Sequence, residues 1–210
     1  MPIPLGERST PAVTGSATEI EVRIDVSKHV AHRDLRDVEL LHRFMARSTG
    51  TLALRGEDQR DQPRVLCRYD LVGGREGRLV VRTPVPWSPD GPAIAVASNT
   101  PVEPPGVGAV GELQLRLVAA YRSDIGSRPV PDDELEDYVR VRLTSAGFAA
   151  SSIEAAPRRW WASAVGARRF PATDVVAHGQ VVNKQFVLAY LSGIGRGRAF
   201  GFGLPIFRCT

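Results

Sequence analysis

The first 83 residues alternate between two hydrophobic periodicities. Apolar side chains occupy every second position from Glu19 to Val26, a spacing that predicts a half-buried strand. A helix is predicted to begin at Asp34 or Asp37 and to end near Ser48, because its apolar residues recur at helical spacing: Val38, Leu41, Phe44 and Met45. Three further strand candidates follow, and the last two flank a glycine-rich turn typical of a hairpin: Leu52–Arg55, Arg64–Tyr69 and Leu79–Thr83.

A second set of elements begins after a proline-rich stretch, residues 84–105, which we interpret as a linker around a degenerate fourth strand. The predicted order is strand, helix, strand, strand, helix, strand: Glu112–Tyr121, Pro131–Ala146, Ile153–Ala164, Thr173–Val182, Lys184–Leu191 and Phe202–Phe207. This order is ferredoxin-like. The first half shows the order β-α-β-β, and the pattern after Thr83 does not define the remaining helix and strand.

The sequence therefore predicts an α+β protein of two tandem ferredoxin-like (RRM-like) domains with a C-terminal glycine-rich loop. The expected boundaries are a loose N-terminal arm over residues 1–17, a first domain over 18–105 and a second domain over 106–210. The glycine-rich loop occupies residues 193–203 of that second domain.

Charge is concentrated in the last sixty residues. Residues 151–210 hold eight basic and two acidic residues, a net charge of +6, whereas residues 1–150 carry a net charge of −2. A basic C-terminal third points to a polyanionic partner. Only Lys28 and Lys184 are lysines among 27 basic residues, and arginine suits phosphate groups and guanine edges.

Composition also narrows the class of protein. No stretch approaches eighteen apolar residues, and the N-terminus lacks the apolar core of a signal peptide, so we expect no membrane association. Cys67 and Cys209 are far apart and match no metal-ligand spacing, which favours free thiols in a reducing cytoplasm. We expect neither a metal nor a cofactor.

The most informative segment is Gly193–Leu204, in which five glycines alternate with two arginines and two phenylalanines. Glycines allow backbone N–H groups to approach an anion closely, and arginines add positive charge, so the loop suits phosphate. A dinucleotide-binding loop follows a strand and opens a helix. Here a predicted helix precedes the loop and a strand follows it, which disfavours that fold.

This segment resembles the glycine-rich loop of the CRISPR-associated repeat-processing endoribonucleases, and it is most similar to the CasE type. The resemblance implies a metal-independent endoribonuclease that cuts CRISPR precursor RNA within the repeat hairpin. Its 2′-hydroxyl attack would leave a 2′,3′-cyclic phosphate. The enzyme would then stay on the mature guide RNA, with other subunits of an interference complex as its partners. The alternative is a non-catalytic repeat-binding subunit of the same fold.

Histidine is the residue type best suited to move protons at neutral pH, and His42 is the catalytic candidate. The resemblance implies this role, because a histidine preceded by an apolar residue occupies this place in the first helix of the CasE type, as in Leu41-His42-Arg43. Some members carry a tyrosine three residues earlier, where this chain has Glu39. A carboxylate there either acts as the catalytic partner or repels the scissile phosphate. His29 and His32 remain substitutes, and His178 on a strand is expected to be structural.

Candidate RNA-binding residues fall into three groups. Arg43 and Arg47 share the first helix, where a solvated face is the equal alternative. The resemblance implies a hairpin that recognises the repeat stem, with Trp160 and Trp161 on opposite faces so that at most one stacks on a base. The remaining candidates lie in the basic C-terminal half: Arg116, Arg158, Arg159, Arg168, Arg169, Lys184, Gly195, Arg196, Gly197 and Arg198.

Overall fold

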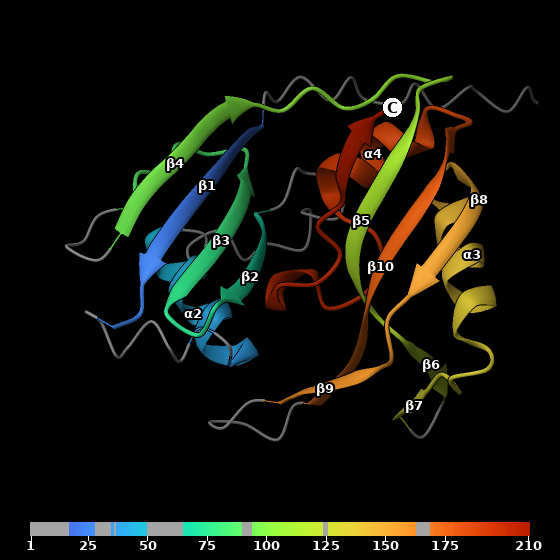
Figure 1. The fold of residues 1–210 in the computed structure, drawn as a ribbon, viewed down its shortest axis with the longest axis horizontal. Coiled ribbons are helices and arrows are strands. Elements are labelled where there is room, and N and C mark those ends of the chain that lie inside the picture. Colours follow the sequence, from blue (N-terminus) through green and yellow to red (C-terminus); the bar gives the residue numbers. More distant parts are fainter. Residues whose placement is uncertain are drawn as a thin grey trace, which may run out of the picture.

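The computed structural model describes residues 17–27, 35, 37–49, 65–89, 94–123, 126–162 and 169–210. These residues form two larger antiparallel sheets that stand side by side, together with a small two-stranded sheet (Figure 1). The mixture of helices and strands expected from the periodicities is confirmed. No helix among these residues has the length and apolar character needed to cross a membrane.

The first sheet has the strand order β2-β3-β1-β4. Its strands are β1 (Thr18–Asp25), β2 (Leu66–Val72), β3 (Glu76–Thr83) and β4 (Ile94–Pro101). Helix α2 (Val38–Ser48) covers one face by packing Leu41 and Met45 against the alternating residues of β1. Asp37 is the N-cap, and its carboxylate accepts hydrogen bonds from the backbone N–H groups of Glu39 and Leu40.

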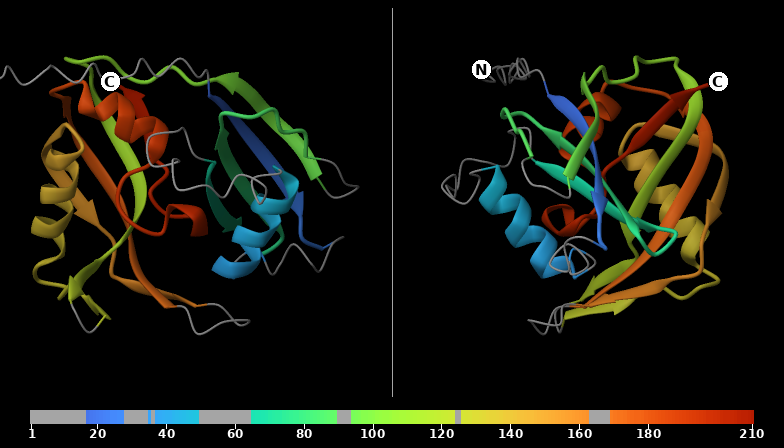
Figure 2. Two further views of the ribbon diagram at one scale, coloured as in Figure 1. Left: turned by 180° about the vertical axis from the view of Figure 1, so that it is seen from behind. Right: turned by 60° about the vertical axis from the view of Figure 1, so that its left-hand side comes forward.

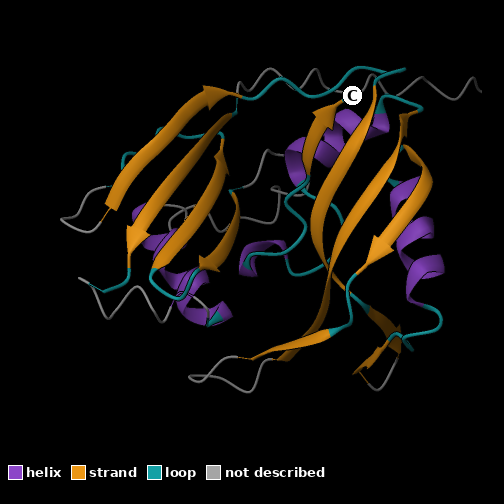
Figure 3. Ribbon diagram, viewed as in Figure 1, coloured by secondary structure: helices purple, strands orange, loops and turns teal. Residues whose placement is uncertain are grey.

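The second sheet has the order β11-β5-β10-β8, with the short strand β9 paired to β10. Its strands are β5 (Val110–Val118), β8 (Phe148–Ala155), β9 (Arg159–Ala162), β10 (Arg169–Val181) and β11 (Ile206–Cys209). Helices α3 (Leu135–Ser145) and α4 (Gln185–Ser192) contribute Val139, Leu143 and Phe186 to the core of this half. Figure 3 shows the helices and strands of both halves.

Most predicted elements exist, but several boundaries were wrong. The second helix begins at Leu135 rather than Pro131, because residues 132–134 form a turn before it. The strand predicted over Ile153–Ala164 is two strands, separated at residues 156–158. The last strand starts at Ile206, since Phe202 and Leu204 are buried in non-strand backbone.

The proline-rich stretch contains a full strand, β4, which pairs with β1 along its length.

Cys67 and Cys209 are free thiols, and burial raises the pKa of Cys67 to about 12. The Leu52–Arg55 strand candidate and the N-terminal arm lie outside the described residues.

Arg82 joins the N-terminal half, which contains the first sheet, to the C-terminal half, which contains the second sheet. Its side chain is 1% exposed, and it donates to Glu19 Oε2 at 2.5 and 3.2 Å, to the Tyr190 carbonyl at 2.6 Å and to the Pro205 carbonyl at 3.0 Å. The guanidinium also lies 4.0 Å from the centre of the Tyr190 ring. A β3 arginine is therefore enclosed by a β1 carboxylate and by two backbone segments of the C-terminal half.

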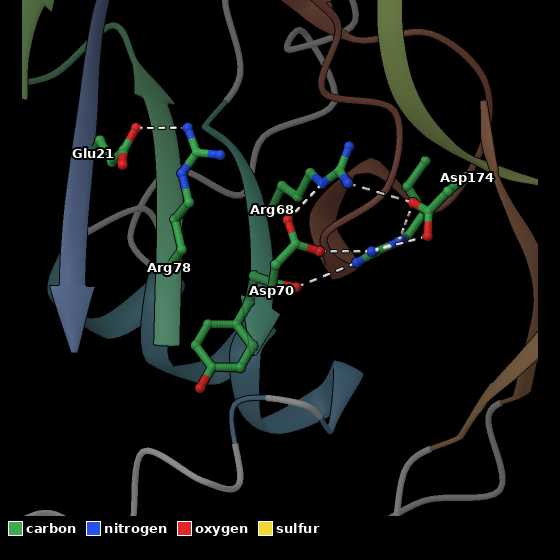
Figure 4. Close-up of polar contacts among 7 residues, drawn as sticks. Glu21, Arg68, Asp70, Arg78 and Asp174 are labelled. Carbon is green, nitrogen blue, oxygen red and sulfur yellow. Dashed lines mark hydrogen bonds and ion pairs between the residues drawn. The ribbon is translucent and has the colours of Figure 1, made fainter. Parts of the chain in front are cut away.

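A second arginine makes the same kind of link from the opposite direction. Arg116 of β5 is 6% exposed and donates to Asp70 Oδ1 of β2 at 2.7 Å and to Asp174 Oδ1 of β10 at 2.9 Å. Arg68 of β2 completes the cluster, with Asp70 at 2.8 Å and Asp174 at 3.6 Å (Figure 4). Burial raises the pKa of Asp70, but Arg68 and Arg116 lower it by more, so the carboxylate stays ionised between the sheets.

We expect Arg82→Ala to lower the free energy of unfolding by about 3–5 kcal/mol, because it leaves a carboxylate and two carbonyls without their buried donor. Urea unfolding followed by circular dichroism measures this loss. Arg208→Ala is the control, since Arg208 is exposed and its pair with Glu112 is 4.0 Å apart. That control should cost less than about 1 kcal/mol. Equal losses in the two variants would show that Arg82 does not hold the halves together.

Candidate nucleic-acid interface

The glycine-rich loop runs between the two halves. It leaves α4, approaches β2 and α2 through the short 3-10 helix η4 (Arg198–Phe200), and returns to β11 (Figures 1 and 2). All of its glycines have positive φ: Gly193, Gly195, Gly197, Gly201 and Gly203. Other residues rarely adopt positive φ, so the course of this loop favours glycine at each of these positions.

The base of the loop is closed by its own backbone. The Ile194 N–H donates to the Gly203 carbonyl at 2.9 Å, and the Gly203 N–H donates to the Arg116 carbonyl at 2.7 Å. Arg198 donates to the carbonyls of Ser192 and Gly193 at 3.1 and 3.3 Å, so it braces the loop from inside. The N–H groups of Ile194 and Gly203 are therefore used within the protein. At its base, the loop does not offer these two groups to an anion. Arg196 is exposed.

His42 meets the tip of this loop. Its Nδ1 lies 2.9 Å from the Ala199 carbonyl oxygen, and its ring centre lies 4.9 Å from that of Phe200. A carbonyl oxygen only accepts hydrogen bonds, so Nδ1 carries the proton and Nε2 is left to accept or donate another. The contact thus sets both the tautomer and the orientation of the ring, as a second residue does in many acid–base sites.

Strand β9 and the start of β10 pair over residues 159–162 and 169–172, and we call this hairpin the β9–β10 arm. Aromatic rings connect His42 to this arm. Phe200 lies 5.1 Å from Phe170 of β10, and Phe170 lies 5.3 Å from Phe202. Phe202 in turn contacts Trp161 of β9 edge to face, at 6.2 Å between centres. The histidine and the base of the arm therefore share one packed cluster.

The two tryptophans of β9 have different environments, as predicted from their alternation. Trp161 packs against the Arg116 guanidinium, 4.2 Å from its ring centre, whereas Trp160 is 57% exposed. Arg159 and Arg169 are exposed on the same arm. Arg158 instead bonds to the Val130 carbonyl and lies 3.4 Å from Asp132.

The remaining candidates are scattered. Glu39 and Arg43 face each other on α2, with 3.6 Å between Oε1 and Nε, while Arg47 is exposed in its last turn. Lys184 is exposed at the start of α4. Arg116 lies in the inter-sheet cluster, where four of its N–H donors are engaged.

Three candidates lie outside the described residues: His29, His32 and Arg168. His178 is on β10, with Nε2 3.9 Å from a Glu112 oxygen. No group of three or more His, Cys, Asp or Glu residues suited to a metal ion occurs among the residues that the structure describes.

Sequence reasoning missed the small hairpin of β6 (Ala120–Ser123) and β7 (Gly126–Pro129). The alternation from Leu113 continues past Val118 without a break, so nothing in the pattern marks the point where the chain leaves the sheet. Gly126 and Pro129, the first and last residues of β7, were the turn signals that the sequence offered.

The chain has the fold of the Cse3 endoribonucleases. It superposes on Thermus thermophilus Cse3 bound to an RNA representing a pre-cleavage complex with a TM-score of 0.79, at 18% identity over 92% of this chain and 99% of the other. For Cas6e from Escherichia coli K-12 the TM-score is 0.63, at 13% identity over 92% and 100% of the two chains.

A chain of a CRISPR RNA-guided surveillance complex also shares this Cse3 fold, with a TM-score of 0.67, 17% identity, and coverage of 92% and 100%. No protein-family model matches the sequence. No curated protein matches it either. At these identities the likeness shows the fold alone, because one fold can carry different chemistry.

Because the loop closes between Ile194 and Gly203, we expect a methyl group at Gly203 to lower the free energy of unfolding. A Cβ there would lie 2.3 Å from the Ile194 carbonyl oxygen, whereas Gly74, with similar φ, has open space around it. Gly74→Ala should cost only the strain of positive φ, about 1–2 kcal/mol. Gly203→Ala should cost about 1–3 kcal/mol more, because backbone must shift.

Urea unfolding measures both variants, and NMR of the His42 ring reports whether the loop tip has moved. Equal destabilisation together with an unchanged His42 signal in Gly203→Ala would show that the loop does not position the ring.

Proposed function

We propose that this protein is an endoribonuclease of the Cse3 (CasE) type that cuts CRISPR precursor RNA within its repeat hairpin. The observation that carries this proposal is His42, held by the Ala199 carbonyl where the first helix meets the glycine-rich loop. The shared fold with RNA-bound Cse3 chains supports it. On this proposal the two halves are tandem ferredoxin-like domains, 18–105 and 106–210, that work in the cytoplasm.

The chemistry needs no external nucleophile. The 2′-hydroxyl oxygen attacks the adjacent phosphorus, the bond to the 5′-oxygen breaks, and a 2′,3′-cyclic phosphate and a 5′-hydroxyl result. His42 exchanges the proton through Nε2. In the neutral ring this atom takes the proton of the 2′-hydroxyl, and in the protonated ring it gives a proton to the leaving 5′-oxygen.

Positive charge for the crowded phosphate comes from exposed arginines around the histidine. Arg43 follows His42 on α2, and its side chain is 50% exposed although it pairs with Glu39. On this proposal Glu39 holds Arg43 rather than acting on substrate. The β9–β10 arm, with Arg159, Arg169 and the exposed Trp160, grips the repeat stem.

The product RNA remains bound, and the protein joins an interference complex with other CRISPR subunits. Its fold likeness to a chain of a CRISPR RNA-guided surveillance complex supports this part of the proposal.

We expect His42→Ala to slow cleavage of a repeat hairpin by about 10²–10⁴-fold, the usual contribution of a general acid–base group. Hairpin affinity should change by only a few-fold. His178→Ala is the matched control, because His178 is exposed and lies beside Glu112 in the C-terminal sheet, whereas His42 is on α2. Single-turnover cleavage assays and gel shifts measure the two effects. Normal cleavage by His42→Ala would contradict the assignment. RNA binding without cleavage by the unmodified protein would favour the non-catalytic alternative.

Cleavage should persist in excess EDTA, since the attacking hydroxyl belongs to the RNA and the proton transfer uses an imidazole. A repeat with a single 2′-deoxy nucleotide at the cut site should bind normally and resist cleavage. Denaturing gels of both reactions provide the measurement. An absolute requirement for Mg²⁺ or Mn²⁺, or cleavage of the 2′-deoxy substrate, would refute internal attack.

A further inference from the structure

The β6–β7 hairpin and the β9–β10 arm leave the C-terminal sheet at the same end, opposite the C-terminus (Figures 1 and 2). Their bases are hydrogen bonded together. The Ala119 N–H donates to the Pro171 carbonyl at 2.7 Å, and the Val130 N–H donates to the Ala119 carbonyl at 3.0 Å. Arg158 adds a bond to the Val130 carbonyl. The small hairpin is therefore fixed relative to the arm that carries Trp160.

The register of the hairpin separates its side chains into two faces. Tyr121 lies opposite Arg128, and Arg122 lies opposite Ser127. Directly opposed residues of an antiparallel pair share a face, while neighbours along a strand point to opposite faces. Tyr121 and Arg128 therefore share one face, and Arg122 and Ser127 share the other.

The Tyr121 face is held against the start of α3. The Tyr121 hydroxyl donates to Glu134 Oε2 at 2.9 Å, and its ring meets that of Tyr138 edge to face, with 5.5 Å between centres. The side of the hairpin that carries Arg122 consequently points away from α3.

The Arg122 face receives the glycine-rich loop. Arg196 donates to the Ser127 hydroxyl at 3.1 Å, so Arg196 reaches the face that carries Arg122 although 73 residues separate the two arginines in sequence. Both side chains are exposed, and no carboxylate of the described residues forms an ion pair with either. Two exposed guanidinium groups on one face, neither of them in an ion pair with a described carboxylate, supply positive charge that suits an anion.

This face also lies close to the proposed reaction centre along the chain. Arg196 precedes Ala199, whose carbonyl holds His42, by three residues. Three trans peptide units span at most about 11 Å between Cα atoms. An RNA strand placed at His42 therefore passes the Arg196 region within a few nucleotides.

We propose that the Arg122 face of the β6–β7 hairpin, together with Arg196, is a second RNA-binding surface that contacts backbone phosphates beside the cut site. The proposal rests on the proposed function. It assigns a phosphate-contacting role to Arg122, and it excludes Arg128 of the same hairpin from that role.

The experiment compares Arg122→Ala with Arg128→Ala, a matched control that removes the same charge from the opposite face. Filter-binding titrations at several salt concentrations use repeat hairpins with and without single-stranded extensions, with thermal melts to confirm folding. Loss of one phosphate contact should reduce the salt slope by about 0.7–0.9 and the affinity by about four- to six-fold at 0.15 M salt. Arg122→Lys should retain the slope because it keeps the charge.

A loss on the blunt hairpin identifies stem phosphates as the ligand, and a loss only with extensions identifies the flanking strand. Unchanged binding by Arg122→Ala, or an equal loss in Arg128→Ala, would overturn the proposal while the unmodified protein still binds and cuts. Failure of the unmodified protein to bind the hairpin would instead count against the proposed function itself.

Discussion

The structure depends on burying the glycine-rich loop and two arginines between sheets that share no strand. Arg82 crosses from the first half to the Tyr190 and Pro205 carbonyls, and Arg116 crosses from the second half to Asp70 and the Tyr69 carbonyl. An arginine suits this task because its planar group offers five donors that several acceptors can share. The two carbonyls bonded by Arg82 flank the segment that contains the loop, so the same contacts that join the halves also determine where the loop lies.

That location explains how a flexible composition yields a defined site. Glycines with positive φ allow the chain to turn repeatedly, and closure between Ile194 and Gly203 restrains the two ends. The tip then packs Phe200 between His42 and Phe170. A single loop thus contacts the first helix, the inter-sheet cluster and the base of the β9–β10 arm. On the proposed function, binding of the RNA stem and orientation of the catalytic histidine depend on one packed unit.

Arginine has two distinct roles in this protein. Arg82, Arg116 and Arg198 are engaged by carbonyls and carboxylates and stabilise the fold. Arg122, Arg159, Arg169 and Arg196 are exposed at the end of the C-terminal half from which the arms project. The net charge alone cannot separate the two groups. Burial and the positions of Glu19, Asp70 and Asp174 do so, because a paired buried guanidinium adds little to the field felt by a polyanion.

The sequence by itself determined the two β-α-β-β patterns, a helix that starts at Asp34 or Asp37, a glycine-rich loop between a helix and a strand, and the opposite faces of Trp160 and Trp161. Each of these follows from local periodicity or composition. The resemblance of residues 193–204 pointed to the Cse3 fold and to His42. Only the tertiary structure decided that Ala199 orients His42, that Arg116 is structural and that Arg196 bonds to Ser127 opposite Arg122. These are contacts between residues far apart in the chain, and their register is set by how the two halves pack, which no local pattern encodes.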